Sequence, residues 1–452
     1  MRCIKGFARG KGLHGRRMQG VSGGRLKAVV NTPPFCIDRD PAVPEKVIVK
    51  NLYKVYGSEP GRAMDMLRAG QTKDQIFQQT GMVVGVTDAS FAVNEGEIFV
   101  LMGLSGSGKS TLIRLLNRLV EPTHGQILLG GQDVAAMSKK ALIALRRKDL
   151  AMVFQSFALL PHLSVLQNTA FGLEVAGVDR KARERRAMEV LDQVGLRTFA
   201  HQMPAALSGG MQQRVGLARA LAVDPSLMLM DEAFSALDPL KRTEMQNLLL
   251  QLQKEQQRTI VFVSHDLDEA FHIGNRIAIM EGGRIVQVGT PAEILRNPSD
   301  AYVRAFFQGV DVKKYLLAQD VARMDETLLI RPSLDARADM AQAVEQLRQT
   351  RRNYAFVVGD DARLRGGVSL DTLLRGLESG ASSLDGLYLD DMGPVPASLT
   401  LNALIGRIVR HPLPLPVVDA QQRYLGAVTQ TVLLQKMVDI DAHAQAGEAG
   451  HE

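Results

Sequence analysis

The sequence lacks long apolar runs and has few cysteines. No apolar stretch approaches the roughly 18 to 20 residues needed to span a bilayer. Short runs such as Ile98–Met102 and Leu227–Met230 are typical of buried strands. We therefore expect any membrane role to come from docking onto a partner. The two cysteines, Cys3 and Cys36, offer neither a disulfide framework nor metal-ligand spacing, which fits a reducing cytoplasm.

Acidic residues are missing from the start of the chain. The basic residues from Arg2 to Lys27 all precede the first acid, Asp38. Residues 1–44 are interpreted as a basic, disordered leader, or as upstream sequence read from an early start codon. They lack the apolar core of a secretory signal. A basic arm for nucleic acid or anionic lipid is the alternative, but few aromatic residues accompany it, and we expect no nucleic-acid partner.

The long middle of the chain reads as one α/β domain. Residues 45–310 alternate short apolar runs with amphipathic segments. Strands are predicted at Lys46–Leu52 and Val86–Val93. A polar insertion, residues 57–82, lies between them, and its stretch Arg62–Phe77 has helical character.

An internal repeat indicates a second domain over residues 325–438. The segment Tyr354–Ser369 recurs sixty residues later as Pro414–Thr429. Each copy reads strand, turn, strand and then helix. A unit this small cannot bury its sheet alone, so we expect the two copies to pack together. Residues 439–452 are acidic and rich in alanine and glycine, which predicts a flexible tail.

A glycine-rich loop follows the apolar run Ile98–Met102. It fits the pattern G-x-x-x-x-G-K-[ST], and leucines at helical spacing come after it. Strand, loop and helix place backbone N–H groups around phosphates. Lys109 is expected to reach the β- and γ-phosphates of a nucleotide and Ser110 to ligate Mg²⁺. The loop residues are Gly103, Leu104, Ser105, Gly106, Ser107, Gly108, Lys109, Ser110 and Thr111.

Three further apolar runs end in polar groups. Asp231 and Glu232 follow Leu227–Met230, and strands of such sheets end at the ligand crevice. Asp231 is placed to hold Mg²⁺ and Glu232 to act as general base; the alternative is that both only cap a helix. His265 follows the strand Thr259–Ser264 and is a candidate γ-phosphate contact. Gln155 follows another short run, where its amide can touch Mg²⁺ and the attacking water.

A second glycine-rich element, Leu207–Arg214, opens another predicted helix. Its hydroxyl and small residues suit a γ-phosphate, although the chain already has a complete phosphate loop. Two such elements in one domain make sense if two copies of the domain share each nucleotide. The candidate contacts here are Ser208, Gly209, Gly210 and Gln212.

In order and spacing, these elements resemble the nucleotide-binding domain of ABC ATPases. The motifs are Gly103–Thr111, Gln155, Leu207–Gln212, Leu227–Glu232, Ser235–Asp238 and His265. The resemblance implies a P-loop α/β fold with a mixed core sheet, an antiparallel β subdomain and a helical subdomain at about residues 156–222. It also implies that ATP and Mg²⁺ bind between two copies, with Ser208 and Gly210 facing the partner's γ-phosphate. Asp238 would lie in a loop that crosses between subunits. Tyr56 would stack on adenine, with Tyr53 as the alternative.

A closer resemblance, over about Lys46 to Leu434, is to the ATP-binding subunits of glycine betaine/L-proline importers. Its markers are the insertion, Phe154–His162, Met230–Pro239, Asp266–Ala270 and a tail that resembles a pair of CBS modules. It implies an ATPase on the cytoplasmic face of a bacterial inner membrane, a permease partner and, indirectly, a periplasmic or extracellular substrate-binding protein. Alternatives are an importer of another small solute, a soluble ABC ATPase, or a nucleotide switch without hydrolysis.

The tail leaves two regulatory hypotheses. Ribose-binding CBS pockets carry an aspartate where this sequence has Thr372 and Val432, which argues against a nucleotide there. A cluster of arginines makes the region locally basic. The cluster is either a solvated surface or a contact with anionic lipid whose attraction weakens as ionic strength rises. The cluster consists of Arg348, Arg351, Arg352, Arg363 and Arg365.

Overall fold

The computed structural model describes residues 43–307, 311–324, 327–332, 335–389, 393–411 and 413–445. The leader expected at residues 1–44 therefore lies outside the described residues, except for its last two positions. Within the described ranges, no helix is both long enough and apolar enough to cross a membrane.

A mixed six-stranded sheet forms the centre of the first domain, in the order β10-β9-β3-β8-β7-β6. The strands from β9 to β6 run parallel, and only β10 pairs antiparallel with its neighbour. Their bounds are β3 Ile98–Met102, β6 Leu150–Val153, β7 Leu227–Asp231, β8 Thr259–Val263, β9 Arg276–Glu281 and β10 Arg284–Gly289. The mixed core predicted for an ABC-type P-loop fold is confirmed.

Alternation along β3 divides the core into two layers. Ile98, Val100 and Met102 belong to a cluster shared with the helices after β6. Phe99 and Leu101 belong to a second cluster, which includes the antiparallel strands and the helix after the glycine-rich loop. Because successive side chains point to opposite faces of a sheet, a fully apolar strand needs cover on both sides.

An antiparallel sheet of order β2-β1-β4-β5 covers one of these faces. Its strands are β1 Glu45–Tyr56, β2 Val83–Asn94, β4 His124–Leu129 and β5 Gln132–Asp133. The first two strands extend beyond the predicted Lys46–Leu52 and Val86–Val93 and form a hairpin whose tip carries the insertion. Short apolar runs mark only the buried part of such strands.

The insertion forms two helices, α1 Pro60–Arg68 and α2 Lys73–Thr80, rather than one helix over Arg62–Phe77. Gly70 adopts a positive φ of 83° between them, which ends the first helix. Thr72 then starts the second helix with a capping box. Buried Ala63, Met64 and Ile76 give the insertion an apolar core against the hairpin.

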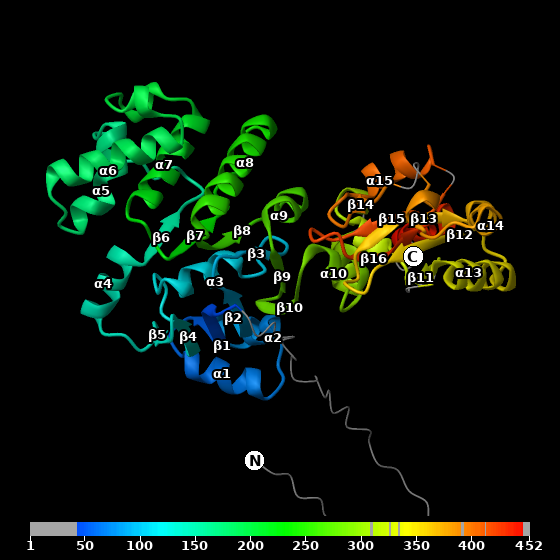
Figure 1. Ribbon diagram of the computed structural model, residues 1–452. Helices are drawn as coiled ribbons and strands as arrows, with labels where there is room; N and C mark the ends of the chain where they lie inside the picture. Colours follow the sequence, from blue (N-terminus) through cyan, green and yellow to red (C-terminus); the bar gives the residue numbers. More distant parts are fainter. Residues whose placement is uncertain are drawn as a thin grey trace, which may run out of the picture. The chain divides into compact units, whose positions relative to one another are not determined.

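The helical subdomain expected at about residues 156–222 contains α5 Val165–Val175, α6 Arg180–Gln193 and α7 Gly209–Ala222, with the short turns η1 Arg197–Phe199 and η2 Pro204–Ala206. Figure 1 shows α5, α6 and α7 packed side by side. The remaining helices of the first domain are α3 Lys109–Leu116, α4 Lys139–Lys148, α8 Pro239–Gln256, α9 Leu267–Ile273, α10 Pro291–Arg296 and α11 Ala301–Phe306.

The repeat forms two small α/β units of the same order, strand-helix-strand-strand-helix. The first contains β11 Leu328–Ile330, α13 Ala336–Thr350, β12 Tyr354–Val358, β13 Leu364–Ser369 and α14 Leu370–Ser379. The second contains β14 Val395–Pro396, α15 Leu401–Ile408, β15 Leu415–Val418, β16 Tyr424–Val428 and α16 Gln430–Gln445. Short segments η3 Val312–Lys314 and α12 Ala318–Val321 precede them, and η4 Asp385–Leu387 lies between them.

Reciprocal hydrogen bonds join the two units. The amide of Leu364 donates to the carbonyl of Gln422 at 3.1 Å, and that of Tyr424 donates to the carbonyl of Ala362 at 2.9 Å. Phe356 of one unit and Tyr424 of the other share a buried cluster. The helix α16 continues to Gln445, beyond the position where the tail 439–452 was expected to begin, and the last seven residues lie outside the described part.

Candidate active site

Four parallel strands bring the predicted site residues to one edge of the core sheet. β3 leads into the glycine-rich loop, and β6 ends two residues before Gln155. β7 ends at Asp231, directly before Glu232, and β8 ends two residues before His265. Because these strands run parallel, their carboxyl ends lie together. The topology therefore gathers groups that are up to 162 residues apart in the sequence.

Two glycines of the loop are required by their surroundings. A Cβ on Gly103 would lie 2.2 Å from the carbonyl oxygen of Met280, and one on Gly108 would lie 2.4 Å from that of Gly85. Both residues also adopt positive φ, 150° and 101°. Only glycine fits such positions without strain. The two ends of the loop thus pack tightly against the backbone of β9 and β2, while its centre, residues 104–106, is exposed.

The Lys109 side chain crosses this loop. Its Nζ donates to the carbonyl oxygens of Gly103 at 2.8 Å and of Leu104 at 3.0 Å. Burial lowers the pKa of the ammonium, while the nearby Glu232 and Asp231 carboxylates oppose that shift. The cation lies where the loop's amides and the start of α3 already favour an anion.

Ser110 and Asp231 place two hard oxygen groups side by side. The Ser110 hydroxyl donates to Oδ1 of Asp231 at 3.1 Å, and Nη2 of Arg114 lies 3.3 Å from Oδ2. The Asp231 side chain is 7% exposed, so the paired arginine compensates for its burial. A hydroxyl beside a carboxylate is the donor chemistry that Mg²⁺ prefers. The residues present therefore fit the expected metal.

Glu232 is held in an unusual backbone conformation. Its φ is 46°, in the left-handed region, and its amide donates to the carbonyl of Val263 at 3.1 Å. Such strain costs on the order of 1–3 kcal/mol and is concentrated at functional sites. The side chain meets two partners: Nε2 of Gln155 donates to Oε2 at 3.1 Å, and Nδ1 of His265 lies 3.5 Å from the same atom.

The second glycine-rich element lies at the start of α7 and points outward. The Ser208 hydroxyl caps the helix by accepting from the amide of Met211 at 3.4 Å, and Ser208 and Gly209 are exposed. Gly210 is half-buried. The Gln212 amide donates to the carbonyls of Pro204 and Leu207, so this side chain holds its own loop. Asp238, also exposed, caps α8.

Tyr56 lies nearer the phosphate loop than its position before the insertion suggests. Its hydroxyl is 3.4 Å from Oγ1 of Thr111, and the residue is 39% exposed. The Lys54 ammonium lies 4.8 Å from its ring centroid. Tyr53 instead packs beside His124, with ring centroids 6.2 Å apart. The geometry favours Tyr56 over Tyr53 as the exposed ring beside the nucleotide loop.

The structure thus brings Lys109, Ser110 and Asp231 together, and Gln155, Glu232 and His265 beside them. No hydrogen bond among the described residues joins Ser208, Gly210 or Asp238 to that group. The sequence reading missed Arg114. Its position four residues after Ser110 puts both on one face of α3, and that spacing could have identified it.

The site combines a complete phosphate loop with a second glycine-rich element that faces outward. This combination indicates an ATPase of the ABC transporter class. The family model described as ABC transporter matches residues 86–235. The chain belongs to the glycine betaine/proline betaine family of ABC transporter ATP-binding subunits, as its relatives show. ABC-type ATPases bind and hydrolyse ATP, and so does this one.

Three relatives support this assignment. The glycine betaine/proline betaine transport system ATP-binding protein ProV of Salmonella typhimurium is 52% identical over 394 residues, 87% of this chain and 97% of the relative. The glycine betaine transport ATP-binding protein OpuAA of Bacillus subtilis is 45% identical over 86% of this chain and 92% of its own. The trimethylamine N-oxide transport system ATP-binding protein TmoW of Pelagibacter ubique is 43% identical over 71% of this chain and 93% of the relative.

Proposed function

We propose that this chain powers the import of glycine betaine, proline betaine or a related quaternary amine through a separate permease. The observation that carries the hydrolytic part is the meeting of Gln155, Glu232 and His265 beside the phosphate loop. The substrate class rests on the names of the relatives. We expect no contact between the transported amine and this chain.

ATP binding is assigned to the loop Gly103–Thr111 and to Tyr56. Lys109 neutralises the β- and γ-phosphates, and the amides of the loop donate to their oxygens. The exposed Tyr56 ring offers a stacking surface for adenine. Mg²⁺ held by Ser110 and Asp231, with Gln155 in reach, would supply positive charge to the phosphate oxygens.

Glu232 is assigned as the general base. It accepts hydrogen bonds, so its carboxylate can orient a water molecule and draw its proton. The water oxygen forms a bond to the γ-phosphorus, the bond to the ADP oxygen breaks, and phosphate leaves. Gln155 and His265 both touch Oε2 of Glu232, which fixes the direction of the carboxylate. His265 is also expected to contact the γ-phosphate.

A second copy of the chain is the expected partner for the outward-facing elements. Ser208 and Asp238 cap the helices α7 and α8, and within the described residues no hydrogen bond joins them to the phosphate loop of their own chain. In a two-fold dimer they would complete the partner's site. Each ATP is then clamped between Lys109 of one chain and Ser208 of the other, and hydrolysis removes the phosphate that links them.

Contact with the permease is assigned to residues 157–163. All of them are half-buried or exposed, including Phe157, Leu159 and Leu160. The segment starts two residues after Gln155 and is tied to α7, because Arg219 donates to the carbonyls of Phe157 and Ala158. Through the permease the chain would lie on the cytoplasmic face of the inner membrane, with a substrate-binding protein acting from the other side.

The tandem repeat is proposed as a regulatory CBS pair. Its strand-helix-strand-strand-helix order fits that module. The Thr372 hydroxyl bonds both the amide and the carbonyl of Ser369, so it serves the cap of α14. Arg363 and Arg365 are 58% and 53% exposed and share one counter-ion, Asp361, at 3.8 and 3.4 Å. The positive charge that remains supports the alternative of a salt-screened electrostatic contact.

Uptake by the reconstituted complex tests this function. Labelled glycine betaine should accumulate in vesicles only with ATP on the side of this chain, and Glu232→Gln should stop it. Uptake that persists with this variant would contradict the assignment, and so would ATP hydrolysis that no quaternary amine stimulates.

A further inference from the structure

His265 owes its placement to its neighbours rather than to its own contacts. Its side chain is 57% exposed, and within the described part of the chain its ring is held by a single contact, Nδ1 to Oε2 of Glu232 at 3.5 Å. A group that must meet a phosphate and a carboxylate needs a fixed direction. The residues on either side, Ser264 and Asp266, supply it.

Ser264 anchors one side of the loop that carries His265. Its hydroxyl accepts from the amide of Asp266 at 3.0 Å and donates to Oε2 of Glu269 at 2.5 Å. Gln246 of α8 donates to the other oxygen of Glu269 at 3.2 Å. Ser264, Gln246 and Glu269 are 1%, 6% and 5% exposed, so this is a buried and satisfied polar network.

Asp266 anchors the other side. Its Oδ1 accepts from the amide of Glu269 and so caps α9, while its Oδ2 accepts from Nη1 of Arg242 at 2.7 Å. The Asp266 side chain is 31% exposed and that of Arg242 is 26% exposed. Both are less exposed than the fully solvated ion pairs that contribute little to stability. A charged hydrogen bond of this length is among the stronger contacts in proteins.

Arg242 also holds the loop that follows Glu232. Its Nη2 donates to the carbonyl of Leu237 at 3.3 Å, one residue before Asp238. In the same loop the Ser235 hydroxyl donates to the carbonyl of Glu232 at 2.9 Å. One guanidinium therefore joins the loop of His265 to the loop 235–238, which the proposed dimer would place against the partner chain.

We propose that Arg242 and Asp266 form a positioning pair. The pair holds His265 in contact with Glu232 only when the loop 235–238 has the position that it takes in the proposed dimer. The inference rests on the proposed function of the site. The contacts of the pair are with the two loops and the start of α9, so it acts through His265. Its loss therefore slows hydrolysis of bound ATP and leaves ATP binding intact.

The test is a mutant cycle in the full-length chain, with ATP turnover, the KM for ATP and the melting temperature measured together. Asp266→Asn keeps a good helix cap and removes the charge. Arg242→Gln removes the same pair from the other side. Each should lower kcat by about 5- to 50-fold, with the KM for ATP within about twofold, and the double variant should lose no more than the worse single one.

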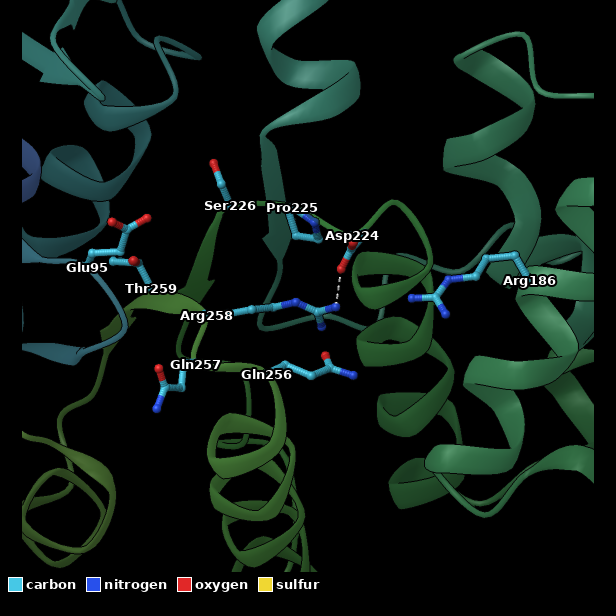
Figure 2. A pocket seen from close by; sticks show the side chains of 9 residues that line it. All are labelled: Glu95, Arg186, Asp224, Pro225, Ser226, Gln256, Gln257, Arg258 and Thr259. Atoms are coloured by element: carbon cyan, nitrogen blue, oxygen red, sulfur yellow. Dashed lines mark hydrogen bonds and ion pairs between the residues drawn. The ribbon is translucent and has the colours of Figure 1, made fainter.

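Two controls give the result its meaning. In a His265→Ala background, Asp266→Asn should cause no further loss of kcat, because the pair acts through that histidine. The second control is another Arg–Asp ion pair, Asp224 and Arg258, which lies at the opposite end of the sheet and lines a polar cavity of about 550 Å³ (Figure 2). Asp224→Asn should leave kcat unchanged.

Additive losses in the cycle would overturn the proposal. Single variants with kcat within twofold of the wild type would also overturn it, as would a further loss of kcat in the His265→Ala background. The same holds if the losses of kcat parallel a fall in the melting temperature. Absence of ATP turnover in the wild-type chain would instead contradict the proposed function itself, so the two failures are distinguishable.

Discussion

Gln155 donates through Nε2 to Oε2 of Glu232 across 3.1 Å, and thereby connects the proposed permease contact to the proposed general base. Gln155 lies two residues before the apolar segment 157–163, and Glu232 follows the strand β7. A shift of that segment would move the amide and change the direction of the carboxylate. The contact offers a short physical route by which the transport partner can control hydrolysis.

The carboxylate itself is the first target. Glu232→Gln preserves shape and hydrogen bonding but cannot accept a proton from water. We expect ATP binding to persist and hydrolysis to fall by roughly 10²- to 10⁴-fold, the usual range for a lost general base. Single-turnover hydrolysis and equilibrium binding of labelled ATP measure the two effects separately. Near-normal turnover would remove Glu232 from this role.

A substitution at Lys109 should instead weaken ATP binding. Lys109→Ala removes the buried cation from the phosphate loop, so we expect the affinity for ATP to fall by at least about tenfold, as for other buried charged contacts to a ligand. Titration of the full-length chain with a fluorescent ATP analogue measures this. Lys140→Ala, an exposed lysine at the start of α4, is the control and should bind normally. Unchanged affinity in Lys109→Ala would contradict the phosphate contact.

The glycine-rich loop also has a stability signature. Gly103→Ala combines a positive φ with a Cβ 2.2 Å from a backbone oxygen, so it should cost about 3 kcal/mol or more in unfolding free energy. Gly70→Ala also has a positive φ but meets open space, and should cost only about 1–2 kcal/mol. Urea unfolding of both variants compares them. Equal costs would show that the backbone around Met280 yields easily.

Salt dependence tests the tandem repeat. If Arg363 and Arg365 contact anionic lipid, replacing both with glutamine should flatten the dependence of uptake on ionic strength in vesicles that contain anionic lipid. The exposed Arg180 of α6 provides the control, since Arg180→Gln removes a cation far from the repeat in the sequence. An unchanged salt profile in the double variant would leave the repeat without a demonstrated sensing role.

Local patterns sufficed for the P-loop, the strand ends and the repeat, because each is written in consecutive residues. Contacts between distant segments could not be predicted in this way. Arg114 pairs with Asp231 and Arg242 with Asp266 only because the fold places α3 beside β7 and α8 beside α9, the helix that follows β8. Helical character in the insertion was visible, but the break at Gly70 depends on one backbone angle.

The central claim is that two chains share each nucleotide, and mixing two inactive variants tests it most directly. Glu232→Gln lacks the base, and Ser208→Arg blocks the outward-facing element. In a mixed dimer, Lys109 and Glu232 of the second variant would meet the intact Ser208 of the first. We predict that the mixture regains up to about a quarter of wild-type ATP turnover, because half of randomly formed dimers then carry one complete site. No recovery on mixing, or full activity of Ser208→Arg alone, would contradict a shared site.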